Sequence, residues 1–186
     1  MKRNNLSVED FFLAPLEDIH IEHLIKCFRN HDLIGSMGWN TFFETHQTEQ
    51  FIRAISSCAL PYCCKESSPL VFGIFLKTAS MPIGYSVLKG MNAELAAAEV
   101  GVAVLEQKYR GYGRLALKST VEYGFQKINL RTIGATILLS NTVSINMCKR
   151  VGFREKEVLP RSWTMPDGEV VDMVWMEITR ENFAAK

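Results

Sequence analysis

The chain has 186 residues, of which 47% are apolar and 22% charged, and its formal net charge at pH 7 is +1. This length suits one domain with a substantial hydrophobic core, and the composition is that of an ordinary soluble globular protein. Because basic and acidic residues nearly cancel, we expect neither nucleic acid nor a membrane as a partner, and the balance argues mildly against a surface for polycations.

The cysteines indicate a reducing compartment. There are five, an odd number, with no CxxC pair and no Cys/His cluster at zinc spacing. The first ten residues are polar and lack the apolar core of a signal peptide, and no apolar run approaches the ~18 residues that cross a bilayer. We therefore expect a cytoplasmic protein with free thiols.

The first third of the chain predicts one strand and two helices. Residues 11–16 resemble a short edge strand, and Ile21, Leu24, Ile25 and Phe28 follow the spacing of one helix face. Residues 32–46 indicate an aromatic loop or broken helix, 47–58 a second helix, and 57–69 a loop. Nearby histidines are interpreted as exposed side chains without a third ligand in the sequence around them, so no metal is assigned; they are His20, His23 and His31.

The rest of the chain predicts strands interrupted by two helices. Three short apolar runs, 70–76, 83–88 and 99–104, are typical of successive antiparallel strands. A long helix follows, with Leu117, Val121, Gly124, Phe125 and Ile128 on one face. A strand (132–139), a helix (141–151) and two strands around a Pro166-Asp167-Gly168 turn complete the chain. This order predicts a mixed α/β sheet with helices packed on it, in a single domain over 1–186 with its core at 11–179.

Two segments suggest a phosphate-bearing ligand. The first, Lys108-Tyr109-Arg110-Gly111-Tyr112-Gly113-Arg114, lies between a predicted strand and the long helix. A helix N-terminus offers unpaired N–H groups and a partial positive charge, glycine lets the backbone approach closely, and the basic side chains add donors. Taken alone, this pattern also fits a tight turn with solvated basic residues. The second segment begins with Asn141, a good N-cap, and ends with Gly152-Phe153.

Together, the Arg-Gly-Tyr-Gly loop and the later Asn-x-x-Ser and Gly-Phe resemble the coenzyme-A signature of the GNAT superfamily of N-acetyltransferases. The Asp-Gly-Glu-Val-Val-Asp segment near the C-terminus further resembles the branch that acetylates ribosomal-protein N-termini, polyamines and amino sugars. The resemblance implies a mostly antiparallel sheet with splayed middle strands and helices on both faces. It also implies acetyl-CoA as co-substrate, an amine as acceptor, and a fold whose members are often homodimers.

The resemblance further implies which residues contact the coenzyme. The splayed strands would hold the pantetheine arm, the glycine loop the pyrophosphate, and Asn141 and Ser144 the arm from the other side. The loop departs from the usual pattern in having Lys108 where Gln or Arg is common, and one extra residue between Glu99 and Gly111. The full set is Val102, Ala103, Val104, Lys108, Tyr109, Arg110, Gly111, Tyr112, Gly113, Arg114, Asn141 and Ser144.

Each candidate catalytic residue has two possible roles. Glu99 matches a carboxylate often seen in this branch, and it is either a general base acting through water or a structural carboxylate paired with a cation. Cys148 stands where many members have a tyrosine that protonates the leaving thiolate; a core residue, with water or another tyrosine as donor, is the favoured alternative. A backbone N–H near Val102 or Ala103 would polarise the acetyl carbonyl. The acceptor pocket would be walled by Arg29, Trp39 and Phe42, which equally suit core filling.

Two other classes of protein compete with an enzyme. A non-catalytic acyl-CoA-binding module of the same fold would bind the coenzyme without turnover, as the missing tyrosine suggests. An interaction protein whose glycine loop is only a turn would not bind acetyl-CoA at all, but the paired motifs argue against it. We therefore expect an acetyl-CoA-dependent N-acetyltransferase that works by direct attack of the amine in a ternary complex.

Overall fold

The computed structural model describes residues 10–28, 69–106, 110–165 and 168–185. The strands are β1 (Phe11–Ala14), β2 (Leu70–Leu76), β3 (Pro82–Asn92), β4 (Ala97–Val104), β5 (Thr132–Leu138), β6 (Arg154–Thr164) and β7 (Val170–Thr179). The helices are α1 (Asp18–Phe28), α4 (Tyr112–Gln126), α5 (Thr142–Val151) and α6 (Arg180–Ala184). None of the helices in these ranges is long and apolar enough to cross a membrane.

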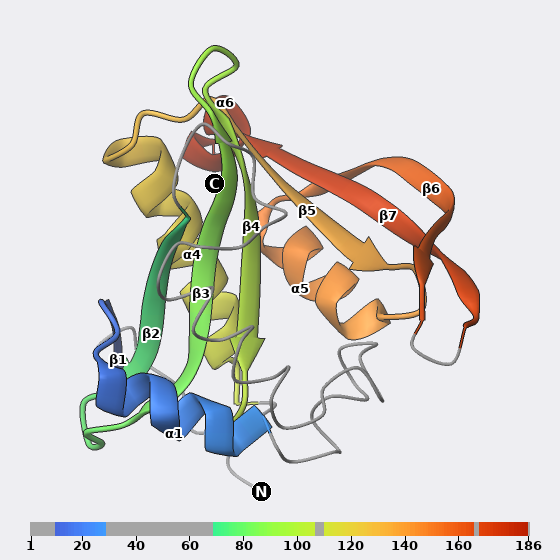
Figure 1. The fold of residues 1–186 in the computed structure, drawn as a ribbon. Coiled ribbons are helices and arrows are strands. Elements are labelled where there is room, and N and C mark those ends of the chain that lie inside the picture. Colours follow the sequence, from blue (N-terminus) through green and yellow to red (C-terminus); the bar gives the residue numbers. More distant parts are fainter. Residues whose placement is uncertain (1–9, 29–68, 107–109, 166–167, 186) are drawn as a thin grey trace, which may run out of the picture.

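The seven strands form one sheet in the order β1-β2-β3-β4-β5-β7-β6 (Figure 1). Every neighbouring pair is antiparallel except β4 and β5, which are parallel. The predicted mixed, mostly antiparallel sheet is therefore confirmed, with small changes at its ends: β1 stops at Ala14, and β3 continues to Asn92. The short helix α6 was not predicted. The expected helix at 47–58 and the aromatic loop at 32–46 lie outside the described residues.

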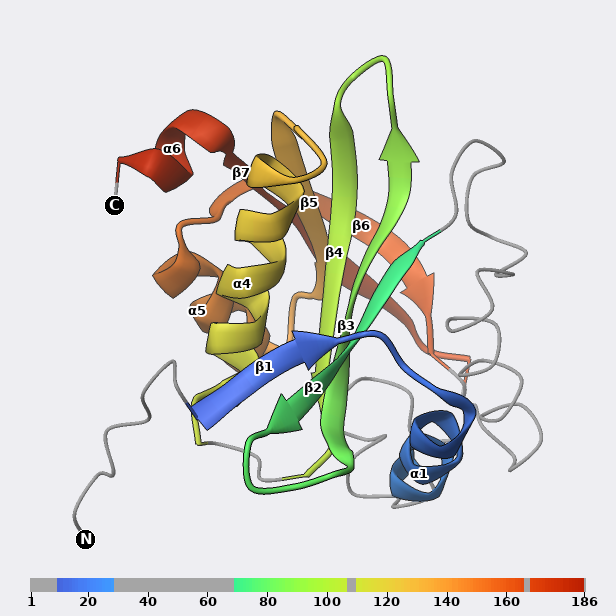
Figure 2. The same cartoon turned by 90° about the vertical axis from the view of Figure 1, so that its left-hand side faces the viewer.

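Helices cover both faces of the sheet, as predicted (Figure 2). On one face, α1 packs Leu24 and Ile25 into a buried cluster with Tyr85 and Val87 of β3. On the other, α4 packs Leu117 into a cluster that includes the next residue of β3, Leu88. Because successive side chains of a strand point to opposite faces, one strand supplies both layers of the core.

The central strands separate after only three registered pairs. β4 and β5 pair at Ala97↔Thr132, Ala98↔Ile133 and Glu99↔Gly134, and no registered pair follows. In Figure 1 the two strands lie together near the top of the view and diverge downward. The remainder of β4 keeps its antiparallel pairing with β3 as far as Val104. The sheet is thus opened into a V whose closed end is at Glu99.

The start of α4 lies beside the open end of this V. Gly111 precedes the helix with φ 89°, a left-handed conformation that favours glycine. A Cβ added to Gly113 would lie 3.5 Å from Val104 Cγ2 and 3.2 Å from Met147 Sδ, so the first turn of α4 packs closely against the end of β4 and against α5. The two glycines therefore have different structural uses: Gly111 permits the turn that precedes α4, and Gly113 leaves room for the first turn of the helix to pack against β4 and α5.

Candidate active site

A cavity of about 420 Å³ occupies the V between β4 and β5. One wall is β4 from Glu99 to Val102, and the other is β5. Side chains of α4 and α5 also line the cavity, and the β6–β7 hairpin contributes Trp163 and Met173. The lining residues are Lys89, Glu99, Val100, Gly101, Val102, Leu117, Ala135, Thr136, Ile137, Leu138, Asn141, Ser144, Met147, Cys148, Trp163 and Met173. The cavity is mostly apolar, with its charged groups gathered at the closed end.

Glu99 is the last residue of β4 that pairs with β5. Its Oε1 accepts a hydrogen bond from the backbone N–H of Thr136 at 3.3 Å, and it lies 3.6 Å from Nζ of Lys89 on the neighbouring strand. The carboxylate therefore accepts a hydrogen bond from a backbone amide of β5 just beyond the last registered β4–β5 pair. Both of these contacts use Oε1, and the Glu99 side chain is 28% exposed.

The first turn of α4 presents the glycine loop. Arg110 and Arg114 are exposed on either side of it, whereas the side chain of Tyr112 is buried in the core. The N-cap residue is Gly111, which has no side chain to accept a hydrogen bond from the first N–H groups of the helix. An uncapped N-terminus flanked by two guanidinium groups is well suited to bind phosphate. Lys108 and Tyr109 lie outside the described residues.

Asn141 caps the N-terminus of α5. Oδ1 of Asn141 accepts a hydrogen bond from the backbone N–H of Ser144 at 3.1 Å, and both residues line the cavity. The capping residue and the Gly152 stop predicted from the sequence are both confirmed; Gly152 has φ 125°. Part of the hydrogen-bonding capacity of Asn141 is therefore used within the helix.

The other predicted coenzyme-binding residues on β4 do not all turn their side chains toward the cavity. Val102 lines the cavity. Ala103 pairs with Tyr85 of β3 and is buried in the cluster under α1, so its side chain points away from the cavity. Val104 packs near Tyr112 and Ala116 at the start of α4. Any contact of Ala103 with a ligand in the V must therefore come through its backbone.

Cys148 is a core residue at the edge of the cavity. Its exposed fraction is 3%, and it belongs to the same buried cluster as Leu117 and Ile137. Burial raises the pKa of its thiol to about 12. Since an ordinary thiol has a pKa of ~8.5, proton transfer from Cys148 to a leaving thiolate would be strongly uphill.

Several residues of the cavity were not predicted from the sequence. Lys89 and Thr136 surround Glu99, and Trp163 and Met173 come from β6 and β7. Lys89 lies directly opposite Glu99 in the β3–β4 register, a relation that could be found only by aligning the two strands. The predicted acceptor-pocket residues Arg29, Trp39 and Phe42 lie outside the described residues.

Comparison with known proteins identifies the family to which this fold belongs. Residues 10–154 match the family described as "Acetyltransferase (GNAT) domain". The chain therefore belongs to the GNAT acetyltransferase family and is an acetyl-CoA-dependent N-acetyltransferase.

Similar proteins agree with this assignment. The chain is 24% identical over 180 residues to the "Uncharacterized N-acetyltransferase p20" of Bacillus licheniformis, covering 96% of this chain and 98% of that protein. A spermidine N-acetyltransferase from Vibrio cholerae, in complex with CoA and spermine, matches with TM-score 0.76 at 17% identity over 94% of this chain and 98% of that one. A GNAT-family acetyltransferase from Bacillus anthracis matches with TM-score 0.75 at 20% identity over the same shares, 94% and 98%. At these identities the structural matches establish the fold.

Proposed function

We propose that acetyl-CoA lies along the V, with its pyrophosphate at the first turn of α4 and its pantetheine arm between β4 and β5. The observation that carries this proposal is the end of the β4–β5 ladder at Glu99↔Gly134. Beyond that pair, β4 has an edge without a registered partner strand, and an extended amide chain can lie along such an edge. The uncapped α4 N-terminus at the open end then meets the phosphates, and the acetyl group reaches toward the closed end.

Glu99 is the group that accepts the proton of the attacking amine, directly or through water. It lies at the closed end of the cavity, where the acetyl group would arrive, and its contacts to Thr136 and Lys89 hold the carboxylate in place. A neutral amine then attacks the thioester carbonyl, and a β4 backbone N–H near Val102 polarises the carbonyl oxygen. The C–N bond forms as the C–S bond breaks, which leaves the acetylated amine and the coenzyme thiolate.

Water supplies the proton to the departing thiolate. Cys148 is a poor donor because burial raises its pKa to about 12. The tyrosines in the described ranges are Tyr85, Tyr112 and Tyr123, and none of them lines the cavity. Water is therefore the donor that remains.

The acceptor that suits this cavity best is an amine with a single positive charge. The charged lining residues in the described part of the chain are Lys89 and Glu99, and they pair with each other. A polycation is bound by carboxylates that are not already neutralised, whereas an α-amine, with a pKa of ~7.7–8, loses its proton readily near neutral pH. A protein α-amine or an amino sugar is therefore favoured over a polyamine.

The whole chain, 1–186, forms a single acetyltransferase domain with its core at 11–179. The family match covers 10–154, and the sheet extends from Phe11 in β1 to Thr179 in β7. Since β7 lies between β5 and β6, the C-terminal hairpin belongs to the same sheet as the cavity.

The role of Glu99 is tested with two variants that break the same ion pair. Glu99→Gln removes the base, so kcat on the best amine of a panel (a peptide α-amine, an amino sugar and spermidine) falls by about 10²–10⁴. Lys89→Gln is the matched control: it also breaks the pair but keeps the base, so kcat changes by less than about fivefold, equivalent to ~1 kcal/mol.

Equal losses of kcat in the two variants would show that Glu99 only pairs with Lys89. Acetyl-CoA binding is measured in both variants by the ligand-induced rise in unfolding temperature, so that a loss of turnover is separated from a loss of coenzyme affinity.

A further inference from the structure

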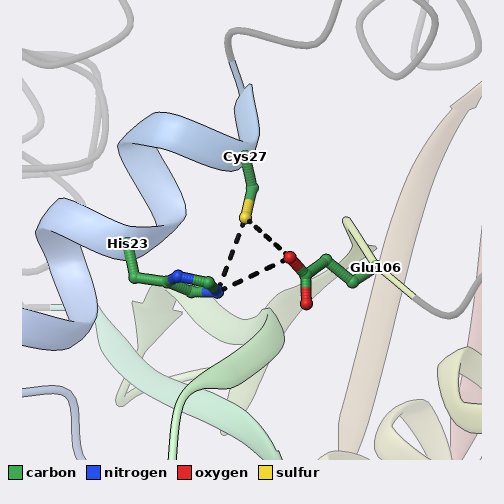
Figure 3. Close-up of side chains that lie close together, drawn as sticks. All are labelled: His23, Cys27 and Glu106. Carbon is green, nitrogen blue, oxygen red and sulfur yellow. Dashed lines mark hydrogen bonds and ion pairs between the residues drawn. The ribbon is translucent and has the colours of Figure 1, made fainter.

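A second cluster of reactive side chains lies outside the cavity, between α1 and the end of β4 (Figure 3). His23 and Cys27 are one helical turn apart on α1, and Glu106 follows β4 by two residues. Cys27 Sγ lies 3.5 Å from His23 Nε2 and 3.5 Å from Glu106 Oε1, and His23 Nε2 lies 3.8 Å from the same Oε1. Figure 3 shows the three ligand atoms turned toward a common point.

These separations are close to those that a tetrahedral metal ion imposes on its ligands. Zinc binds imidazole nitrogen and carboxylate oxygen at ~2.0–2.2 Å and thiolate sulfur at ~2.3 Å, which sets pairs of tetrahedral ligand atoms roughly 3.3–3.6 Å apart. Two of the three observed distances, both 3.5 Å, fall within that range, and the third, 3.8 Å, is slightly longer. Three atoms from three residues are thus placed at the corners of a site that one ion can fill.

We propose that His23 Nε2, Cys27 Sγ and Glu106 Oε1 bind a zinc-class divalent cation. Imidazole and thiolate ligands select zinc over magnesium and calcium, which prefer sites made entirely of oxygen. Glu106 is half exposed, at 48% of its side chain, and His23 at 25%, so an ion can enter from solvent. Three protein ligands leave the fourth position to water.

The position of the cluster gives the ion a structural consequence. Glu106 comes directly before residues 107–109 and the loop Arg110–Arg114. The chain at this point is already held by hydrogen bonds from the N–H groups of Leu105 and Glu106 to the carbonyl of Ile83. An ion shared with α1 would add a fixed connection between that helix and the segment that leads to the loop.

Cobalt binding tests the site directly, because Co²⁺ replaces zinc and reports on its ligands by absorption. Reduced, metal-free full-length protein is titrated with Co²⁺ alone. We expect one equivalent to bind, with a sulfur-to-cobalt charge-transfer band in the near ultraviolet and the strong visible bands of a tetrahedral ion, both removed by Zn²⁺. Cys27→Ser loses the charge-transfer band, and His23→Gln and Glu106→Gln each weaken cobalt binding by at least about tenfold.

The matched control is Cys58→Ser/Cys63→Ser/Cys64→Ser, which removes three other thiols and keeps the cluster. It retains the band at one equivalent. If the wild type binds no Co²⁺ at one equivalent, or if the band survives Cys27→Ser and disappears in the triple variant, the proposal is overturned. Glu106→Gln changes a half-exposed side chain, so its titration decides the matter if Cys27→Ser does not fold. None of these readouts depends on acetyl transfer.

Discussion

Glu99 is the residue at which the sheet changes from paired to open. Its carboxylate accepts a hydrogen bond from the backbone N–H of Thr136 on β5 and forms an ion pair with Lys89 on β3. The same contacts that fix the geometry of the V thus fix the proposed base at its closed end. The Glu99 carboxylate can form the ion pair with Lys89 and also accept a proton from the amine. Comparing Glu99→Gln with Lys89→Gln separates these two roles.

Cys148 gives a prediction at the residue scale. Because its thiol is buried and its pKa is raised to about 12, Cys148→Ala keeps kcat within about twofold of the wild type. The substitution removes one buried heavy atom, so it costs about 1 kcal/mol of stability. Steady-state kinetics and urea unfolding measure the two quantities.

The result that contradicts this view is a loss of kcat of tenfold or more in Cys148→Ala while the protein still binds acetyl-CoA. Such a loss would mean that the thiol donates the proton despite its burial.

Among the elements, β5 is held in place by a close approach that only glycine permits. A Cβ on Gly134 would lie 1.9 Å from Cη2 of Trp175 on β7, so the indole ring covers the backbone of β5 next to the last β4–β5 pair. The indole Nε1 donates a hydrogen bond to Glu177 Oε1 at 2.8 Å, which fixes the ring in this position.

We predict that Gly134→Ala destabilises the protein by about 3 kcal/mol, because the new methyl group displaces the ring and β7 with it. In a Trp175→Ala background the same change costs less than about 1 kcal/mol, since the obstacle is gone. A double-mutant cycle by urea unfolding measures this coupling. Additive effects of the two substitutions would show that the ring does not restrict position 134.

How far the sequence predicts the site also depends on the element. The glycine loop and the α5 cap were predictable because their signals are local: Gly111, Gly113 and Asn141 each act within a few residues of their own position. Lys89 and Thr136 were not, because their relation to Glu99 arises from strand register. Glu106 is 79 residues from Cys27, so the sequence showed two histidines and a cysteine on one helix but not the carboxylate that joins them.

At the scale of the whole molecule, the sheet separates two sites. The cavity is bounded by α4 and α5 on one face, whereas the His23, Cys27 and Glu106 cluster lies with α1 on the other. β4 connects them, since Glu99 lies within it and Glu106 follows it by two residues. The fold class followed from the order of elements, but the V could be expected only from the family resemblance, because no local pattern marks where two strands part.

The central claim, that acetyl-CoA occupies the V with its pyrophosphate at α4, is tested most directly by thermal unfolding with and without acetyl-CoA. Three proteins are compared: the wild type, Arg110→Ala/Arg114→Ala, and Lys118→Ala/Lys127→Ala, which removes the same charge from two exposed positions, one within α4 and one at its C-cap. At ~100 times its Kd, the ligand should stabilise the wild type and the lysine variant by ~2.7 kcal/mol. The account predicts a much smaller rise for the arginine variant at the same ligand concentration; equal rises in all three proteins, or none in the wild type, would contradict it.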